Sequence, residues 1–173
     1  MSAESIILYE NDKFHLRSIN HADIELLRIW KNKNKKYFFH TSIITIEQQL
    51  NWFESFYLME DDHMYIVEEL CEEKPIKVGV VGWRIKKKYA DIYNIMRGER
   101  GHCGGYSMGQ ALRLMFSYIW KKENLSIRCV VLRNNPALEW YISNGMEIVG
   151  EDSLSFYLEY QDYNNPSKFS IKE

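Results

Sequence analysis

The sequence has 173 residues, 46% apolar and 27% charged, a composition typical of one globular domain and not of a disordered chain. Its formal net charge of −2 provides no global field to attract nucleic acid, and no stretch approaches the ~20 apolar residues that a membrane span requires. Three widely separated cysteines match no disulfide framework or metal-ligand spacing, and the N-terminus lacks a signal-peptide pattern, so a cytoplasmic, metal-free protein is expected.

The N-terminal third is predicted to contain one strand and two helices. Residues 14–19 read as a strand, and Asn20 then caps a helix whose apolar side chains follow helical spacing up to Trp30. The basic stretch 31–36 is interpreted as a solvated segment rather than a nucleic-acid patch. The segment 45–57 opens with a capping box, Thr first and Gln three residues later, and continues as a second helix.

The middle of the chain reads as an antiparallel meander of three strands over residues 63–70, 77–88 and 89–96. Gly79 and Gly82 lie inside the second of these strands. Glycines in a strand interior indicate either a bulge or the close approach of another backbone. We therefore expect a local irregularity at this point of the sheet.

The C-terminal half alternates helices and strands. Its elements, in chain order, are a helix over 107–123, a strand over 127–132, a helix over 134–144 with a proline in its first turn, and strands over 146–150 and 154–160. The strand 127–132 is apolar apart from Arg128, and we expect it to be buried on both of its faces.

Together these elements predict a single domain over residues 1–173, with a core over about 14–160 and a loose polar tail over 164–173. The expected fold class is α/β (α+β). It consists of a mixed, mostly antiparallel central sheet of about seven strands, flanked by four helices on both faces.

A glycine-rich turn joins the third meander strand to the helix over 107–123. Such a turn presents free backbone N–H groups at a helix N-terminus, where the helix dipole favours anions. Gly101, Gly104 and Gly105 lack the Cβ atoms that would obstruct a diphosphate, and Arg97 and Arg100 could neutralise its charge. A plain flexible turn is an equal alternative on these residues alone, because the run matches neither a P-loop nor a dinucleotide fingerprint.

The run Asn134-x-x-Ala137-x-x-x-Tyr141-x-x-x-Gly145-Met146 follows this turn. Over 97–146 by motif, and over about 14–160 by element order, the chain resembles the GCN5-related N-acetyltransferase (GNAT) superfamily. The resemblance implies that acetyl-CoA is the co-substrate and that the turn binds its pyrophosphate through Gly101, His102, Gly104, Gly105, Tyr106 and Ser107.

The same resemblance assigns the other cofactor-side and catalytic roles. Asn134 would hold the pantetheine arm, with Asn135 as a neighbouring candidate, and a backbone N–H of Ile95 or Met96 would hold the thioester carbonyl. Tyr141 would protonate the leaving thiolate during direct transfer, without an acyl-enzyme. One departure is Cys103, which stands where the family's loop has its first glycine.

The base that accepts the amine proton stays open on the sequence. Asp91 lies on the strand where this superfamily often has an acid, and His40 lies in the aromatic segment expected to face the acceptor. A chain of water molecules is an equal alternative.

The N-terminal half is similar to acetyltransferases of nucleotide-linked amino sugars, above all the pseudaminic acid pathway branch. The pattern carrying this resemblance is Trp30-Lys-Asn32, the run 37–42 and the run 46–53. Ribosomal-protein alanine and spermidine acetyltransferases share part of it. The favoured acceptor is therefore the primary amine of a nucleotide-linked amino sugar.

The alternative acceptors are a protein N-terminus, a polyamine or an antibiotic, and a further alternative is a non-catalytic CoA-binding regulatory domain. A homodimer is an open alternative to a monomer. The aromatic side chains that could stack on the acceptor are Tyr37, Phe38, His40, Trp52 and Trp83.

Overall fold

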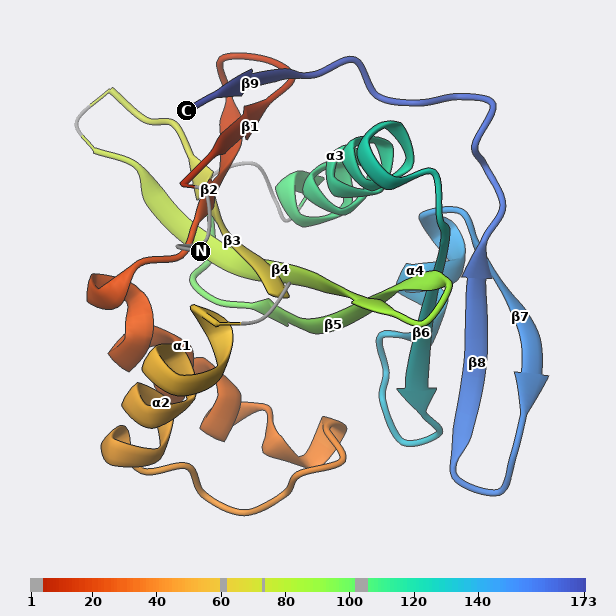
Figure 1. Ribbon diagram of the computed structural model, residues 1–173, viewed down its shortest axis with the longest axis horizontal. Helices are drawn as coiled ribbons and strands as arrows, with labels where there is room; N and C mark the ends of the chain where they lie inside the picture. The colour runs from red at the N-terminus through yellow and green to blue at the C-terminus, as the bar shows by residue number, and fades with distance from the viewer. Residues whose placement is uncertain (1–4, 60–61, 73, 102–105) are drawn as a thin grey trace.

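The computed structural model describes residues 5–59, 62–72, 74–101 and 106–173, apart from the side chain of Tyr106 (Figure 1). These residues form one sheet with the strand order β7-β8-β6-β5-β4-β3-β2-β1-β9. The strands are β1 Ile7–Tyr9, β2 Phe14–Ser18, β3 Asp62–Glu69, β4 Ile76–Lys86, β5 Tyr89–Arg97, β6 Ser126–Leu132, β7 Met146–Glu151, β8 Ser155–Tyr160 and β9 Ser170–Lys172. β5 and β6 pair in parallel and the other described pairs are antiparallel, so the predicted mixed sheet is confirmed.

The helices lie on both faces of this sheet, as predicted. They are α1 Ile24–Lys33, α2 Ile46–Trp52, α3 Tyr106–Glu123 and α4 Leu138–Ser143, with short helical turns η1 His21–Asp23, η2 Lys35–Tyr37 and η3 Phe53–Tyr57. In Figure 1, α3 crosses one face of the sheet while α1 and α2 lie on the other. None of the helices in the described part of the chain is long and apolar enough to cross a bilayer.

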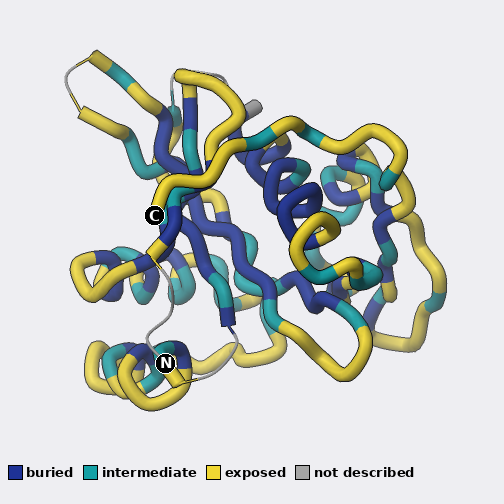
Figure 2. Tube along the Cα trace, turned by 45° about the horizontal axis from the view of Figure 1, so that its top comes forward, coloured by how far each residue is buried: buried dark blue, intermediate teal, exposed yellow. Residues whose placement is uncertain are grey.

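Each face of the sheet carries its own buried cluster (Figure 2). On one side the inner face of α3 contributes Leu112, Met115 and Phe116, which are inaccessible to solvent. On the other side Leu27 and Trp30 of α1 pack with residues of β3, β4 and β5. Helical spacing of apolar residues thus produces the burial that the sequence pattern predicts.

The sheet has nine strands rather than about seven. Both extra strands are three residues long, too short to show an alternating pattern. One of them, β9, lies in the tail expected to be loose, where Ile171 pairs with Leu8 of β1. A strand that contributes only backbone pairing at a sheet edge leaves little trace in side-chain pattern.

The expectation for the apolar strand β6 was also wrong. It is not buried on both faces but alternates, with Ile127, Cys129 and Val131 buried and Val130 40% exposed. The reason is that, among the described residues, helices cover only one face of β6. α3 packs on that face, whereas α1 and α2, on the other side of the sheet, lie against β3, β4 and β5 (Figure 1).

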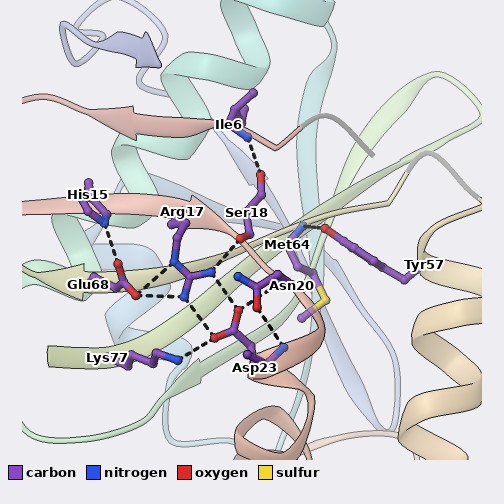
Figure 3. Close-up of polar contacts among 11 residues, drawn as sticks. Ile6, His15, Arg17, Ser18, Asn20, Asp23, Tyr57, Met64, Glu68 and Lys77 are labelled. Atoms are coloured by element: carbon purple, nitrogen blue, oxygen red, sulfur yellow. Dashed lines mark hydrogen bonds and ion pairs between the residues drawn. The ribbon is translucent and has the colours of Figure 1, made fainter. Parts of the chain in front are cut away.

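A network of buried charges fastens the start of α1 to the sheet (Figure 3). The Asp23 carboxylate is inaccessible to solvent and accepts hydrogen bonds from Arg17 of β2, at 2.9 Å, and Lys77 of β4, at 2.8 Å. Arg17 also bonds Glu68 of β3 at 2.9 Å. Burial alone would raise the pKa of Asp23, but the bonds from Arg17 and Lys77 outweigh it and hold that pKa below its usual range.

Candidate active site

The strands β5 and β6 diverge in the middle of the sheet. Their parallel pairing runs from Tyr89 opposite Ser126 to Asp91 opposite Arg128, and both strands continue well past it. Asn94 has a left-handed φ of 52°, and the register between β4 and β5 shifts at the same level. Such a bulge bends its strand and increases its twist. The backbone groups of the diverging segments are thereby left facing a gap instead of a neighbouring strand.

Two cavities meet at this gap. The first, of about 300 Å³, extends toward Arg97 and the start of α3, and the second, of about 400 Å³, extends toward Lys31 and Asp91. The side chains common to both are Tyr37, Phe38, Ile95, Asn135 and Tyr141. Two ligands entering from the two sides would therefore meet beside Tyr141.

Tyr141 is a buried phenol at the junction of the cavities. It lies on α4 with 8% of its surface exposed, and its ring makes an edge contact with Trp140 at 5.1 Å between centroids. Burial raises the pKa of Tyr141 well above the usual value for a phenol. The hydroxyl therefore stays protonated at neutral pH. Because no described residue hydrogen-bonds it, the hydroxyl is available to a ligand.

The two sequence candidates for a base both border the second cavity. Asp91 is buried, and its Oδ2 accepts from Arg84 Nε at 3.1 Å and from Lys86 Nζ at 2.9 Å. The Asp91 carboxylate is thus already bonded to two cations of the protein. His40 is exposed on the segment after η2 and borders the same cavity.

The glycine-rich turn reaches α3 beside a buried carboxylate. Glu69 is 2% exposed and accepts a hydrogen bond from Ser107 Oγ at 2.6 Å, so this hydroxyl is directed into the protein. A Cβ on Gly101 would lie 2.2 Å from Glu69 oxygens, which explains the glycine. Arg97 and Arg100 are exposed, and Arg97 borders the first cavity. The predicted contacts of His102, Gly104 and Gly105, and of the Tyr106 side chain, lie outside the described residues.

The two neighbouring asparagines take different places. Asn135 borders both cavities, and its Oδ1 accepts from the backbone N–H of Ala137 at 2.9 Å, which organises the turn into α4. Asn134 borders neither cavity, and its Nδ2 donates to the Lys36 carbonyl at 3.1 Å. This bond ties the turn before α4 to η2. The structure thus brings the second asparagine, rather than the first, to the junction.

Among the aromatic candidates for the acceptor, Tyr37, Phe38, His40 and Trp52 border the second cavity. Trp83 does not, because it is inaccessible to solvent and stacks on His63 at 4.1 Å between ring centroids. Ile95 borders the junction, and Met96 borders the first cavity.

Lys31 also borders the second cavity, although its sequence context suggested a solvated segment. The signal was its spacing: it follows Leu27 by four residues, which places both on one face of a helix.

Comparison with known proteins identifies the fold. No family model matches the chain, and no curated protein matches it. Solved structures do. A domain from Methanocaldococcus jannaschii DSM 2661 is 19% identical, with a TM-score of 0.73 over 86% of this chain and 99% of that one. The apo structure of FdhC, a nucleotide-linked sugar GNAT, is 13% identical, with a TM-score of 0.69 over 92% and 89%.

Spermidine N-acetyltransferase from Vibrio cholerae, solved with CoA and spermine, is similar to the same extent. It is 17% identical, with a TM-score of 0.70 over 90% of this chain and all of that one. The chain therefore has the fold of the GCN5-related N-acetyltransferases, as the sequence resemblance predicts. At these identities the likeness establishes the fold, and the activity has to be argued from the site.

Proposed function

We propose that the protein is an acetyl-CoA-dependent N-acetyltransferase that moves the acetyl group directly to a primary amine. The observation that carries the proposal is the meeting of two cavities beside one buried, protonated phenol, Tyr141. A direct transfer needs this arrangement, because donor and acceptor must be bound together with their reacting atoms in contact.

The first cavity fits the donor. Its walls are largely apolar, with Met108, Pro136 and Trp140, and suit a pantetheine arm. Where β5 and β6 diverge, their backbone N–H and C=O groups are free to hydrogen-bond the amides of an extended pantetheine chain. At the far end the exposed Arg97 and the N-terminus of α3 supply positive charge for phosphates.

The proposed chemistry uses few protein groups. The amine nitrogen forms a bond to the acetyl carbon, and the carbon–sulfur bond breaks. Tyr141 gives its proton to the departing thiolate, and a backbone N–H of Ile95 or Met96 stabilises the carbonyl oxygen. The amine proton passes to His40 or water, in preference to Asp91, whose carboxylate is held by two cations.

The proposed acceptor is the primary amine of a nucleotide-linked amino sugar. Phe38 and Trp52 on the second cavity are suited to stack on a sugar or base ring. The name of FdhC, a nucleotide-linked sugar GNAT of the same fold, agrees with this choice. Cytoplasmic location and a homodimer remain predictions from the sequence.

Calorimetry with coenzyme A tests the donor half of the proposal. We expect one molecule to bind the native protein and Ala137→Phe, which fills the first cavity, to weaken binding at least about 10-fold, or ~1.4 kcal/mol. Ala22→Phe is the matched control because Ala22 is exposed on η1, away from both cavities.

Equal affinity of both variants for coenzyme A would show that the cofactor does not bind in the first cavity. Release of coenzyme A thiol on addition of primary amines then separates an enzyme from a regulatory domain, which would bind the cofactor without releasing thiol.

A further inference from the structure

Lys31 carries a charge that the protein does not neutralise. It is half-buried on α1, where its Nζ donates to the Asn94 side-chain carbonyl and lies 3.7 Å from the Phe38 ring centroid. No described carboxylate pairs with it. The partners are a neutral amide and an aromatic face, so the ammonium keeps a full uncompensated charge at the wall of two cavities.

The cations that lie nearest to Lys31, and those beside the start of α1, are paired with carboxylates. Arg17 and Lys77 share the Asp23 carboxylate, and Arg84 and Lys86 share Asp91. Burying an ammonium without a counter-charge is costly. Here burial and, to a smaller extent, repulsion from the nearby Arg84 guanidinium together lower the pKa of Lys31 to about 8. The ligand-free protein thus holds two neighbouring cations at some cost in stability.

The described residues that border the second cavity carry more positive than negative charge. Lys31, Arg84 and Lys86 are among them, and their one carboxylate, Asp91, is already paired with Arg84 and Lys86. The adjoining cavity of about 330 Å³ around Lys31 has glutamines, Asn94 and His40 as its polar walls, and no carboxylate among its described lining residues. A polycation would be repelled by these cations, whereas an anion could pair with the Lys31 ammonium.

We propose that Lys31 and Arg84 bind an anionic group of the acceptor, a phosphoryl or carboxylate, while its amine reaches toward Tyr141. The inference rests on the proposed function and assigns the residues that would bind the negative charge of its acceptor, whether that acceptor is a nucleotide-linked amino sugar or another anionic amine. Lys31 is then a specificity-determining residue, supported by Asn94, which orients the ammonium from the bulge of β5. Polyamines fall outside this class.

Titration calorimetry with small amines tests this subsite, with and without coenzyme A present. The probes share one amino-sugar ring: glucosamine has no anion, glucosamine 1-phosphate has a phosphoryl group, and muramic acid has a carboxylate. Spermidine serves as the polycation. We expect the native protein to bind at least one anionic probe about 10-fold or more tightly than glucosamine. The stronger of the two identifies the anion.

Lys31→Met keeps the apolar stem and removes the charge. We expect the preference for the anionic probe to fall to within about 2-fold of glucosamine. Lys33→Met is the matched control, since Lys33 is exposed on the same helix, and its preference should stay native. The melting temperature is a second measurement. We expect Lys31→Met to raise it, whereas it would fall if Lys31 served to stabilise the fold.

The proposal is overturned if the native protein binds all four probes alike, if spermidine binds best, or if Lys31→Met retains the preference. Failure of coenzyme A to bind would count against the proposed activity alone, because the probe preference is also measured without it.

Discussion

At the scale of single residues, the proposed chemistry depends most on the Tyr141 hydroxyl. Its burial raises its pKa, so below that value it holds the proton that a leaving thiolate needs. We expect Tyr141→Phe to lower kcat roughly 10-fold or more, at least ~1.4 kcal/mol, with KM for acetyl-CoA little changed.

Steady-state kinetics check this prediction, with Tyr118→Phe as the control. Tyr118 is also a buried tyrosine, 5% exposed on α3, but it borders neither cavity at the junction. An unaltered kcat in Tyr141→Phe would take the acid role away from this residue.

Single residues also show where sequence reasoning stops. Tyr141 became a candidate because the resemblance to the GNAT superfamily assigns a role to the tyrosine of this motif, and the structure places it where the two cavities meet. Lys31 and Lys33 look alike within a basic run. The spacing of Lys31 from Leu27 becomes informative only once the packing of Leu27 and Trp30 shows which face of α1 is buried. The choice between Asn134 and Asn135 likewise depends on the turn before α4, which no periodicity describes.

At the scale of elements, the close packing of α3 on β4 at Gly79 positions Met108, which forms part of the wall of the first cavity. A Cβ on Gly79 would lie 2.4 Å from Met108 Sδ and 2.5 Å from the Met96 carbonyl oxygen. Met108 can shift, but the backbone of β5 cannot do so without disturbing the bulge. We expect Gly79→Ala to lower the free energy of unfolding by about 1–3 kcal/mol in urea titrations.

Gly150→Ala provides the comparison for this variant. A Cβ there would meet nothing closer than Tyr157 Cδ2 at 3.7 Å, an ordinary contact. Equal stability of the two variants would mean that the α3 contact accommodates the methyl group and does not constrain the sheet.

The elements themselves were predictable to different degrees. Long periodic segments such as α3, and the capping box that opens α2, were located from their side chains. β1 and β9 were missed because three residues are too few to show an alternating pattern, and β9 at the sheet edge is joined to β1 by backbone pairing. The burial of β6 was misjudged although the one charged residue of the strand, Arg128, already marks an exposed face, because the apolar residues beside it do not reveal which face a distant helix covers.

At the scale of the whole molecule, the buried charge network of Arg17, Asp23, Lys77 and Glu68 links three strands to α1. Burial opposes ionisation of both carboxyls, but their bonds hold the pKa of each below its usual range. A carboxyl with a lowered folded pKa contributes stability that is complete above its unfolded value, about 4, and is lost as the pH falls through the folded value.

Asp23→Asn tests this contribution. We expect a loss of roughly 2–3 kcal/mol at pH 7, below the 3–5 kcal/mol of a fully buried pair because Arg17 and Lys77 are partly exposed. The deficit should shrink as the pH falls below about 4. Asp12→Asn, at an exposed site, is the control. A deficit that stays constant from pH 7 to acid would show that the charge of Asp23 is not what stabilises the fold.

Tyr37 and Phe38 border both cavities, and this shared wall has a thermodynamic consequence. If occupancy of one side moves these rings, the affinity on the other side changes by some factor, and linkage requires that factor to be the same in both directions. The dissociation constant measured for either ligand then depends on whether the other ligand is bound, so the donor and acceptor affinities have to be measured together.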